Sequence, residues 1–182
     1  MPPFCRETQN NHSCLLKSDF ALDEIHRLEK LQCVKRVSPN DSLVNIPLSV
    51  VYSNKWRLVV DASRHLNPFV KKRKVRLDSL DDLADLIQRN DYLAVSDLDS
   101  GYWHVPLHPD MHKFCGVSIH NSATGQTEYF QWLVLFLGLC DAVFIFTHLL
   151  LPVMKYLRSI GWEGVIYIDD RGTLGRDYLQ CL

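Results

Sequence analysis

The sequence lacks an excess of charge of either sign. Its 182 residues carry 20 Lys and Arg against 21 Asp and Glu, a formal net charge of −1. With this balance, a protein that binds nucleic acid has to segregate its cations along the chain. Eight glycines and eight prolines are too few for a collagen-like or low-complexity protein. The 47% of apolar residues and 23% of charged residues predict one globular domain, or two very small ones.

Paired cysteines are also lacking. The six cysteines are scattered, with no C-x-x-C spacing, which excludes a zinc-finger framework and predicts a reducing, intracellular location, nuclear or cytoplasmic. The start MPPFCRETQNNH has no apolar core, so we expect no secretory signal. Neither a G-x-S-x-G elbow nor a G-x-x-x-x-G-K-[ST] loop is present. His104, His108 and His112 share a four-residue spacing, but Pro106 and Pro109 interrupt any helix that would join them.

The hydrophobic pattern predicts alternating helices and short strands. A helix over 19–32 has Ser18 or Asp19 as its cap, and a second helix starts with a capping box of Ser79 and Asp82 and an apolar stripe over 80–87. The further elements that we expect are an extended edge segment at 43–53, a strand at 56–63, a buried strand at 92–98, a hairpin with its tip at 120–128, a long helix at 141–159 and a strand–turn–strand at 164–175.

Charge is segregated in the middle of the chain. Residues 55–76 hold eight cations and one anion, whereas residues 77–110 hold eight anions and one cation. One interpretation is a basic loop followed by a solvated acidic helix. The other is a cationic strand and loop that contact phosphates, beside an acidic site that holds metal.

Three aspartates follow apolar strands. Asp97 ends the strand predicted at 92–98, and Asp169 and Asp170 follow Val165–Ile168. Carboxylates that converge repel one another, and a hard divalent cation relieves that repulsion. An Asp-Asp pair is also common in turns, so a purely structural role stays open for these residues taken alone.

The order of these segments resembles reverse transcriptases of retroelements, of the DIRS or gypsy type. The resemblance covers about residues 18–182, with the segments KWRLVVDASRHLN (55–67), DLDSGYWHVPLHPDMHKFCGVS (97–118), FQWLVLFLGLCDAVFIFTHLL (130–150) and VIYIDD (165–170). It implies an α+β, right-hand polymerase fold, with an antiparallel palm sheet packed on helices. The implied division is an N-terminal tail at 1–17, a fingers-like region at 18–92 and a palm-like region at 93–182.

The resemblance also implies a site for RNA-directed DNA polymerisation by two-metal nucleotidyl transfer. The implied catalytic and metal-binding residues are Asp97, Asp169 and Asp170, with the Leu98 carbonyl near the metals. Two Mg²⁺ ions are the implied cofactors, with Mn²⁺ as an alternative, and the partners are dNTPs and an RNA or DNA template with its primer. The implied nucleotide contacts are Lys55, Arg57, Ser100, Gly101, Tyr102, Leu137 and Gly138, with Tyr102 excluding a ribose 2′-hydroxyl.

Several features depart from the family. Leu135–Gly138 lacks the usual Leu-Pro-Phe-Gly proline, and Arg171 places a cation beside Asp170 that we expect to compete with Mg²⁺. The chain stops at Leu182, before any thumb or RNase H counterpart, so we expect a fragment with a weak primer–template grip and reduced or lost activity.

Two alternatives remain open. A non-catalytic remnant would bind nucleic acid through residues 55–76 without metals. A single-span membrane protein would use residues 132–151, although Asp141 at the centre costs about 2.5–3.5 kcal/mol on insertion scales. We favour the interpretation without a membrane.

Overall fold

The structure is a computed structural model that describes residues 4–5 and 8–181. The chain forms two compact units that alternate along the sequence. The first unit comprises the described residues up to Lys72 together with Tyr102–Ala142, and the second comprises Arg73–Gly101 and the described residues from Val143 onwards. The linear division into tail, fingers-like and palm-like regions stays a prediction.

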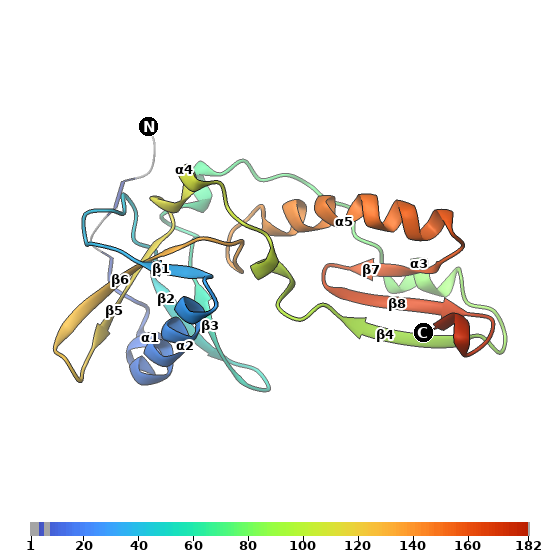
Figure 1. Cartoon of the computed structure of the whole chain (residues 1–182), viewed down its shortest axis with the longest axis horizontal. Coiled ribbons are helices and arrows are strands. Elements are labelled where there is room, and N and C mark those ends of the chain that lie inside the picture. The colour runs from blue at the N-terminus through green and yellow to red at the C-terminus, as the bar shows by residue number, and fades with distance from the viewer. Residues whose placement is uncertain (1–3, 6–7, 182) are drawn as a thin grey trace. The chain divides into compact units, whose positions relative to one another are not determined.

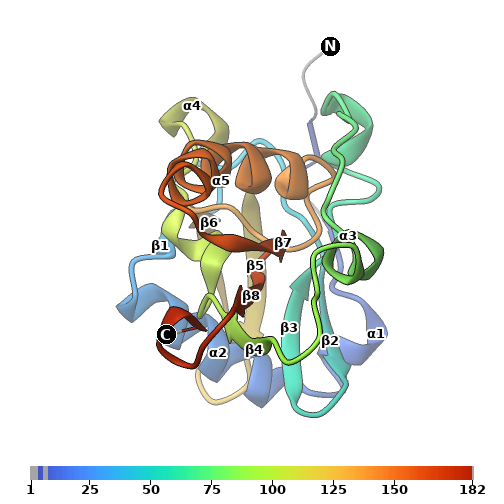
Figure 2. The same cartoon turned by 90° about the vertical axis from the view of Figure 1, so that its right-hand side faces the viewer.

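The first unit contains two antiparallel sheets and short helices (Figure 1). One sheet has the strand order β1-β6-β5, and β2 and β3 form a second, two-stranded sheet, a hairpin that is seen clearly in Figure 2. The elements are α1 (His12–Leu15), α2 (Ser18–Lys30), β1 (Val34–Arg36), β2 (Leu48–Tyr52), β3 (Trp56–Val60), η1 (Asn67–Phe69), α4 (Pro109–His112), β5 (Gly116–Asn121) and β6 (Gln126–Trp132). A further short helix, η2 (Gly101–His104), begins at Gly101, the last residue of the segment Arg73–Gly101 of the second unit. Its other residues belong to the first unit.

The helix predicted at 19–32 is confirmed as α2. Its residues Ala21, Ile25 and Leu28 recur on one side and are buried, so the amphipathic pattern sets the face that packs inward. The predicted cap is wrong, because the helix already begins at Ser18 and no side chain caps it. The hairpin predicted around 120–128 is confirmed by the pairing of β5 with β6.

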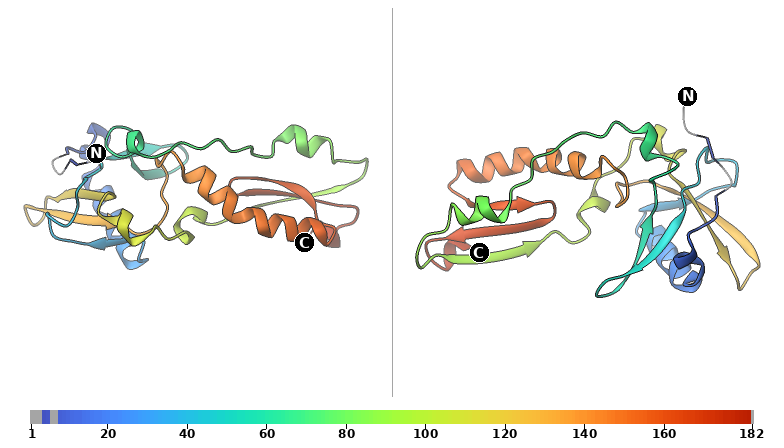
Figure 3. Two further views of the ribbon diagram at one scale, coloured as in Figure 1. Left: turned by 90° about the horizontal axis from the view of Figure 1, so that it is seen from above. Right: turned by 180° about the vertical axis from the view of Figure 1, so that it is seen from behind.

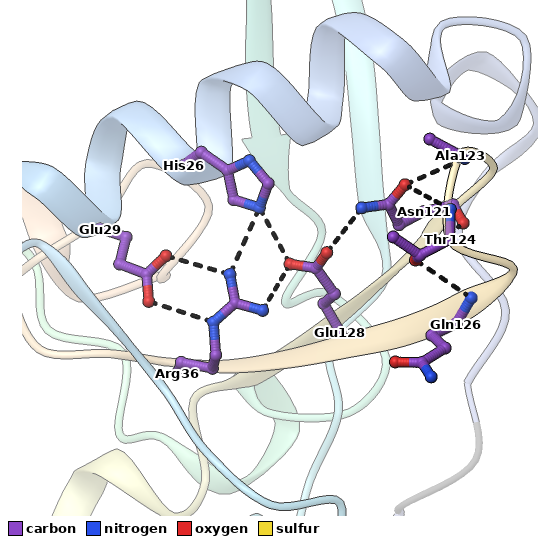
Figure 4. Close-up of polar contacts among 8 residues, drawn as sticks. All are labelled: His26, Glu29, Arg36, Asn121, Ala123, Thr124, Gln126 and Glu128. Atoms are coloured by element: carbon purple, nitrogen blue, oxygen red, sulfur yellow. Dashed lines mark hydrogen bonds and ion pairs between the residues drawn. The ribbon is translucent and has the colours of Figure 1, made fainter.

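A charged network joins α2 to this sheet (Figure 4). Glu128 on β6 accepts hydrogen bonds from the Asn121 amide at 2.8 Å, His26 Nε2 at 2.9 Å and the Arg36 guanidinium at 2.7 Å. Arg36 also pairs with Glu29 at 3.2 Å. Burial by itself raises the pKa of Glu128, but these three donors outweigh it and hold that pKa at about 2. The ionised carboxylate is therefore the form that holds helix and sheet together.

The second unit contains one antiparallel sheet of strand order β4-β8-β7 (Figure 1). Figures 1 and 3 show α5 running along the β7 side of this sheet. The elements are α3 (Leu80–Ala84), β4 (Tyr92–Asp97), α5 (Ala142–Ser159), β7 (Glu163–Tyr167), β8 (Asp170–Gly175) and η3 (Leu179–Cys181), where Ala142 is the final residue of the first unit. The predicted long helix and strand–turn–strand are confirmed.

The core of this unit is small, and two predictions about it are wrong. Leu83 from α3 packs with Val165 and Leu174 as a buried cluster. The capping box of Ser79 and Asp82 forms as predicted, but the helix ends at Ala84, so the stripe does not extend to residue 87. The strand β4 is exposed rather than buried, with Val95 73% exposed, because so short a helix covers only part of the sheet.

Asp78 provides a hydrogen-bond acceptor for one backbone N–H of the edge strand β7. Its carboxylate accepts the Ile166 N–H at 3.1 Å and pairs with Arg158 of α5 at 2.9 Å. An unpaired backbone donor at a sheet edge is a template for aggregation, and this contact occupies it. The same contact ties α5 to the sheet.

No helix among the described residues is both long and apolar enough to span a membrane. The helix α5 carries Pro152 in its interior, as the sequence predicts, and takes up the apolar residues of the 132–151 segment only from Ala142 onwards. The described fold is mixed α/β with antiparallel sheets. The right-hand polymerase architecture is a proposal.

The Glu128 network predicts acid-sensitive stability. The folded pKa of about 2 lies below the ordinary value of 4.5, so the stabilisation is present above about pH 4.5 and is lost as the pH falls towards 2. We expect Glu128→Gln to lower the free energy of unfolding by about 2 kcal/mol at pH 7 and by progressively less at acidic pH. Urea unfolding monitored by circular dichroism between pH 7 and pH 2.5 measures this difference.

The control is Asp23→Asn, which removes an exposed carboxylate from α2, the helix that the network joins to the sheet, and should change stability by less than about 0.5 kcal/mol. A Glu128→Gln effect that is equal at pH 7 and pH 2.5 would contradict the assignment.

Candidate functional site

The site begins with the tight hairpin that carries the paired aspartates. Tyr167 of β7 pairs with Asp170 of β8, which leaves Ile168 and Asp169 as a two-residue loop. Ile168 has φ +60°, a conformation that a β-branched residue rarely adopts. Backbone strain of this kind persists only where the surrounding structure holds it, and it is concentrated at functional sites.

The pairing of β4 with β8 brings Asp97 to this hairpin. Asp97 lies directly opposite Asp170 in the antiparallel register, and the Leu98 N–H donates to the Asp169 carbonyl oxygen at 3.0 Å. The backbone of Asp97 is therefore adjacent, within one unit, to those of Asp169 and Asp170, which lie more than 70 residues later in the sequence. A pocket of about 620 Å³ between residues 78–83 and this sheet includes Asp170 and Tyr167 among its lining residues, but neither Asp97 nor Asp169.

The electrostatics of this register favour a cation. Residues directly opposite in an antiparallel pair project from the same face, so Asp97 and Asp170 present two carboxylates side by side. Like charges in that position destabilise a sheet, and Mg²⁺ or Mn²⁺ would remove the repulsion. Mg²⁺ is commonly held by only one or two carboxylates together with substrate phosphates, so this donor set fits it.

The structure does not assemble a complete set of ligands. Within residues 4–5 and 8–181, no three His, Cys, Asp or Glu side chains lie close enough to hold a metal ion. The carbonyl oxygen of Leu98, the further predicted ligand, accepts the Gly101 N–H at 3.3 Å. The metal-binding role of these residues therefore stays a prediction.

Arg171 lies on the opposite face of the sheet from the two carboxylates. It is the next residue along β8, and its guanidinium donates to the Ser96 hydroxyl at 3.2 Å. We expected this cation to compete with Mg²⁺. The alternation of side chains along a strand directs it away from Asp170 instead.

Ser100 and Gly101 lie in the turn that follows β4. Ser100 has φ +55°, and its hydroxyl donates to the Asp99 carboxylate at 3.0 Å. A Cβ added at Gly101 would lie 2.7 Å from the Phe146 ring of α5, so any larger residue at this position would have to displace the ring. The turn is therefore packed closely against the helix.

The remaining predicted nucleotide contacts belong to the first unit. Lys55 and Arg57 are exposed at the start of β3, whereas Tyr102 is buried, with 9% of its surface exposed. Leu137 is 58% exposed, whereas Phe136 and Leu139 of the same loop are buried. The predicted residues are thus grouped in two sets, one in each unit.

The loop that carries Leu137 and Gly138 lies against the end of β3. Gly138 has φ +109°, and a Cβ at this position would lie 2.0 Å from the Val60 carbonyl oxygen. Asn67 bridges the same two segments by hydrogen bonds to Gly138 and Cys140. No local pattern marks Asn67, because Asn before Pro is typical of a turn and its partners lie 71 and 73 residues away.

Comparison with known proteins gives a distant viral relative. No family model matches the chain. The chain is similar to the genome polyproteins of two isolates of Petunia vein clearing virus, Shepherd and Hohn, with 26% identity over 170 residues in each case. The match covers 90% of this chain but only 7% of the length of each polyprotein.

The close approach at Gly138 makes a prediction about the loop. We expect Gly138→Ala to destabilise the first unit by about 3 kcal/mol or more, because a Cβ clash with rigid backbone adds to the cost of a positive φ. Gly125→Ala is the matched control, since Gly125 also has a positive φ, of +67°, and a Cβ there would meet nothing within 4 Å. We expect about 1 kcal/mol for the control.

Urea unfolding of the three proteins measures both effects. Equal destabilisation by the two substitutions would show that the loop is not held against β3 as described.

Proposed function

We propose that this chain is part of a retroelement reverse transcriptase and carries residues of its fingers and palm. The observation that carries the proposal is the alignment of Asp97 opposite Asp170, beside Asp169 in a strained hairpin. The order of the sequence segments supports it, as does the similarity of 90% of the chain to a viral genome polyprotein. The proposed reaction is template-directed transfer of a nucleotide to a primer 3′-hydroxyl.

The second unit would hold the divalent ions. Asp97, Asp169 and Asp170 supply the carboxylates, and the Leu98 carbonyl is a further ligand once it is released from Gly101. When bound, two such ions supply Lewis-acid stabilisation of the attacking and leaving oxygens of phosphoryl transfer. The exposed sheet edge leaves these carboxylates open to a substrate of phosphate chemistry.

The first unit would bind the nucleotide. Arg57 and Lys55 are exposed cations that neutralise triphosphate charge, and the guanidinium offers a bidentate fit to phosphate oxygens. Leu137 would present its exposed apolar side chain to the sugar and base, with Gly138 beside it in the same loop. Tyr102 is the proposed gate against a 2′-hydroxyl. Template sequence is read by base pairing, so the protein needs contacts to the backbone alone.

Primer extension with Mg²⁺ and dNTPs on an RNA template tests this function. We expect only weak extension by the unmodified chain, and a further loss of at least about 100-fold in Asp97→Asn and Asp169→Asn, since each removes a charge that holds the ions. Asp85→Asn, which changes an exposed aspartate just after α3, is the control and should retain full activity.

Extension that persists in both active-site variants would refute the proposed roles of these carboxylates. Extension absent from the unmodified chain would favour the second candidate.

The second candidate is a non-catalytic nucleic-acid-binding remnant. The observation that favours it is the exposed run Lys71–Lys74, together with the lack of a three-ligand group among residues 4–5 and 8–181. Phosphate contacts of this kind need no metal, and they depend strongly on salt. Both candidates use the cations of residues 55–76.

Salt-dependent binding to labelled single-stranded RNA tests the basic run. We expect the combined substitutions Lys71→Gln, Lys72→Gln and Lys74→Gln to weaken binding and to reduce the slope of log K against log salt by about 0.7 for each phosphate that is no longer neutralised. Asp97→Asn should leave the slope unchanged. A slope that is insensitive to the three lysines would contradict phosphate binding by this segment.

A further inference from the structure

One side chain in the first unit joins the two segments that carry its proposed nucleotide contacts. Asn67 follows β3 and its turn, and its backbone N–H donates to the Ala62 carbonyl oxygen at 2.9 Å. The backbone of Asn67 is therefore held against Ala62, two residues after the end of β3, the strand that bears Arg57. Its side chain extends to the loop at 136–140.

Both ends of the Asn67 amide are used in that contact. Its Nδ2 donates to the Gly138 carbonyl oxygen at 2.8 Å, and its Oδ1 accepts the Cys140 N–H at 2.9 Å. A single side chain thus pairs with two peptide groups, much as a neighbouring strand would. Each such bond is modest on its own, and the two together fix the loop in one orientation.

The contact determines what the loop presents. With Phe136 and Leu139 buried on either side, Leu137 is held outwards at 58% exposure. Gly138 lies so close to Val60 that no other residue fits in this arrangement. If Asn67 released Gly138 and Cys140, the loop would lose a side-chain anchor to the segment that follows β3.

We propose that Asn67 is a positioning residue that sets the loop of Leu137 and Gly138 at a fixed distance from Arg57. This inference rests on the proposed function, because it concerns the binding of a deoxynucleoside triphosphate. Asn67 acts through the loop and does not touch the nucleotide. Its removal should weaken nucleotide binding more than its contribution to stability would explain.

Asn10 provides a matched control with the same chemistry. Its Nδ2 donates to the Ser118 carbonyl oxygen at 2.8 Å, and its Oδ1 accepts the Leu48 N–H at 2.9 Å. It is therefore a second two-ended amide contact in the first unit, between segments that carry no proposed nucleotide contact. Asn10→Ala should cost similar stability without changing the loop.

Cys140 reports on the loop independently of any nucleotide. It is half-exposed, whereas Cys14 and Cys115 are buried, and burial raises their pKa to about 11 and about 12 respectively. These two thiols should react slowly with a maleimide, because the thiolate is the reactive form. Peptide mass spectrometry of the alkylated chain separates Cys140 from Cys5, the other half-exposed thiol.

The experiment compares the full chain with Asn67→Ala, Asn67→Asp and Asn10→Ala. The binding probe is fluorescently labelled dATP with Mg²⁺, followed by anisotropy. We expect Asn67→Ala to raise the Kd about tenfold, which corresponds to about 1.4 kcal/mol, and to speed alkylation of Cys140. Asn67→Asp keeps the acceptor for Cys140 but loses the donor for Gly138, so it should bind as weakly as the alanine variant while protecting Cys140 better.

The outcomes separate this inference from the proposed function. If the unmodified chain binds the nucleotide but Asn67→Ala binds within about twofold of it, or Asn10→Ala loses as much, the positioning role is wrong and the proposed function stands. Unfolding of both Asn67 variants at the assay temperature would also overturn it, since Asn67 would then serve stability alone. If the unmodified chain binds no nucleotide, the proposed function fails, and this role fails with it.

Discussion

The antiparallel pairing of β4 with β8 is the constraint on which the carboxylate site depends. Side chains alternate along a strand, so a shift of one residue would place Asp97 against Arg171 and turn one carboxylate to the other face. Contacts at both ends of the ladder hold the register. The Leu98 N–H bonds to the Asp169 carbonyl oxygen at one end, and Arg176 pairs with Asp91 at the other. The proximity of the Asp97 and Asp170 carboxylates therefore depends on the strand register.

The two units achieve order in different ways. The first has an extensive apolar core, in which α2 packs on the β1-β6-β5 sheet and the Glu128 network joins them. The second has a small core around Leu83, and polar contacts such as Asp78 with Arg158 compensate at its edges. Because so little of this sheet is covered, Asp97 and Asp170 are exposed to solvent. The same lack of cover leaves apolar side chains such as Val95 exposed.

Local patterns in the sequence predicted the elements well, and distant contacts not at all. The periodicity of α2, the capping box at Ser79 and the hairpin at Asp169 depend on neighbouring residues, and each was found. The burial of β4 was wrong because the apolar run gives no information on whether another layer covers it. The contact of Asn67 with Gly138 spans 71 positions and that of Glu128 with His26 spans 102, and no local pattern reveals either. The family resemblance, rather than periodicity, implied that Asp97, Asp169 and Asp170 belong to one site, and it did not give the strand register.

The central claim is that Asp97 and the Asp169–Asp170 pair share one divalent-ion site. Site-directed cleavage by bound Fe²⁺ measures this most directly, because hydroxyl radicals formed at the ion cut the backbone that lies next to it. The account predicts that ascorbate and peroxide produce cuts near residues 97 and 169 together, that excess Mg²⁺ suppresses both, and that Asp97→Asn abolishes both. Cleavage at one of the two segments alone, or cuts at both that persist in Asp97→Asn, would contradict it.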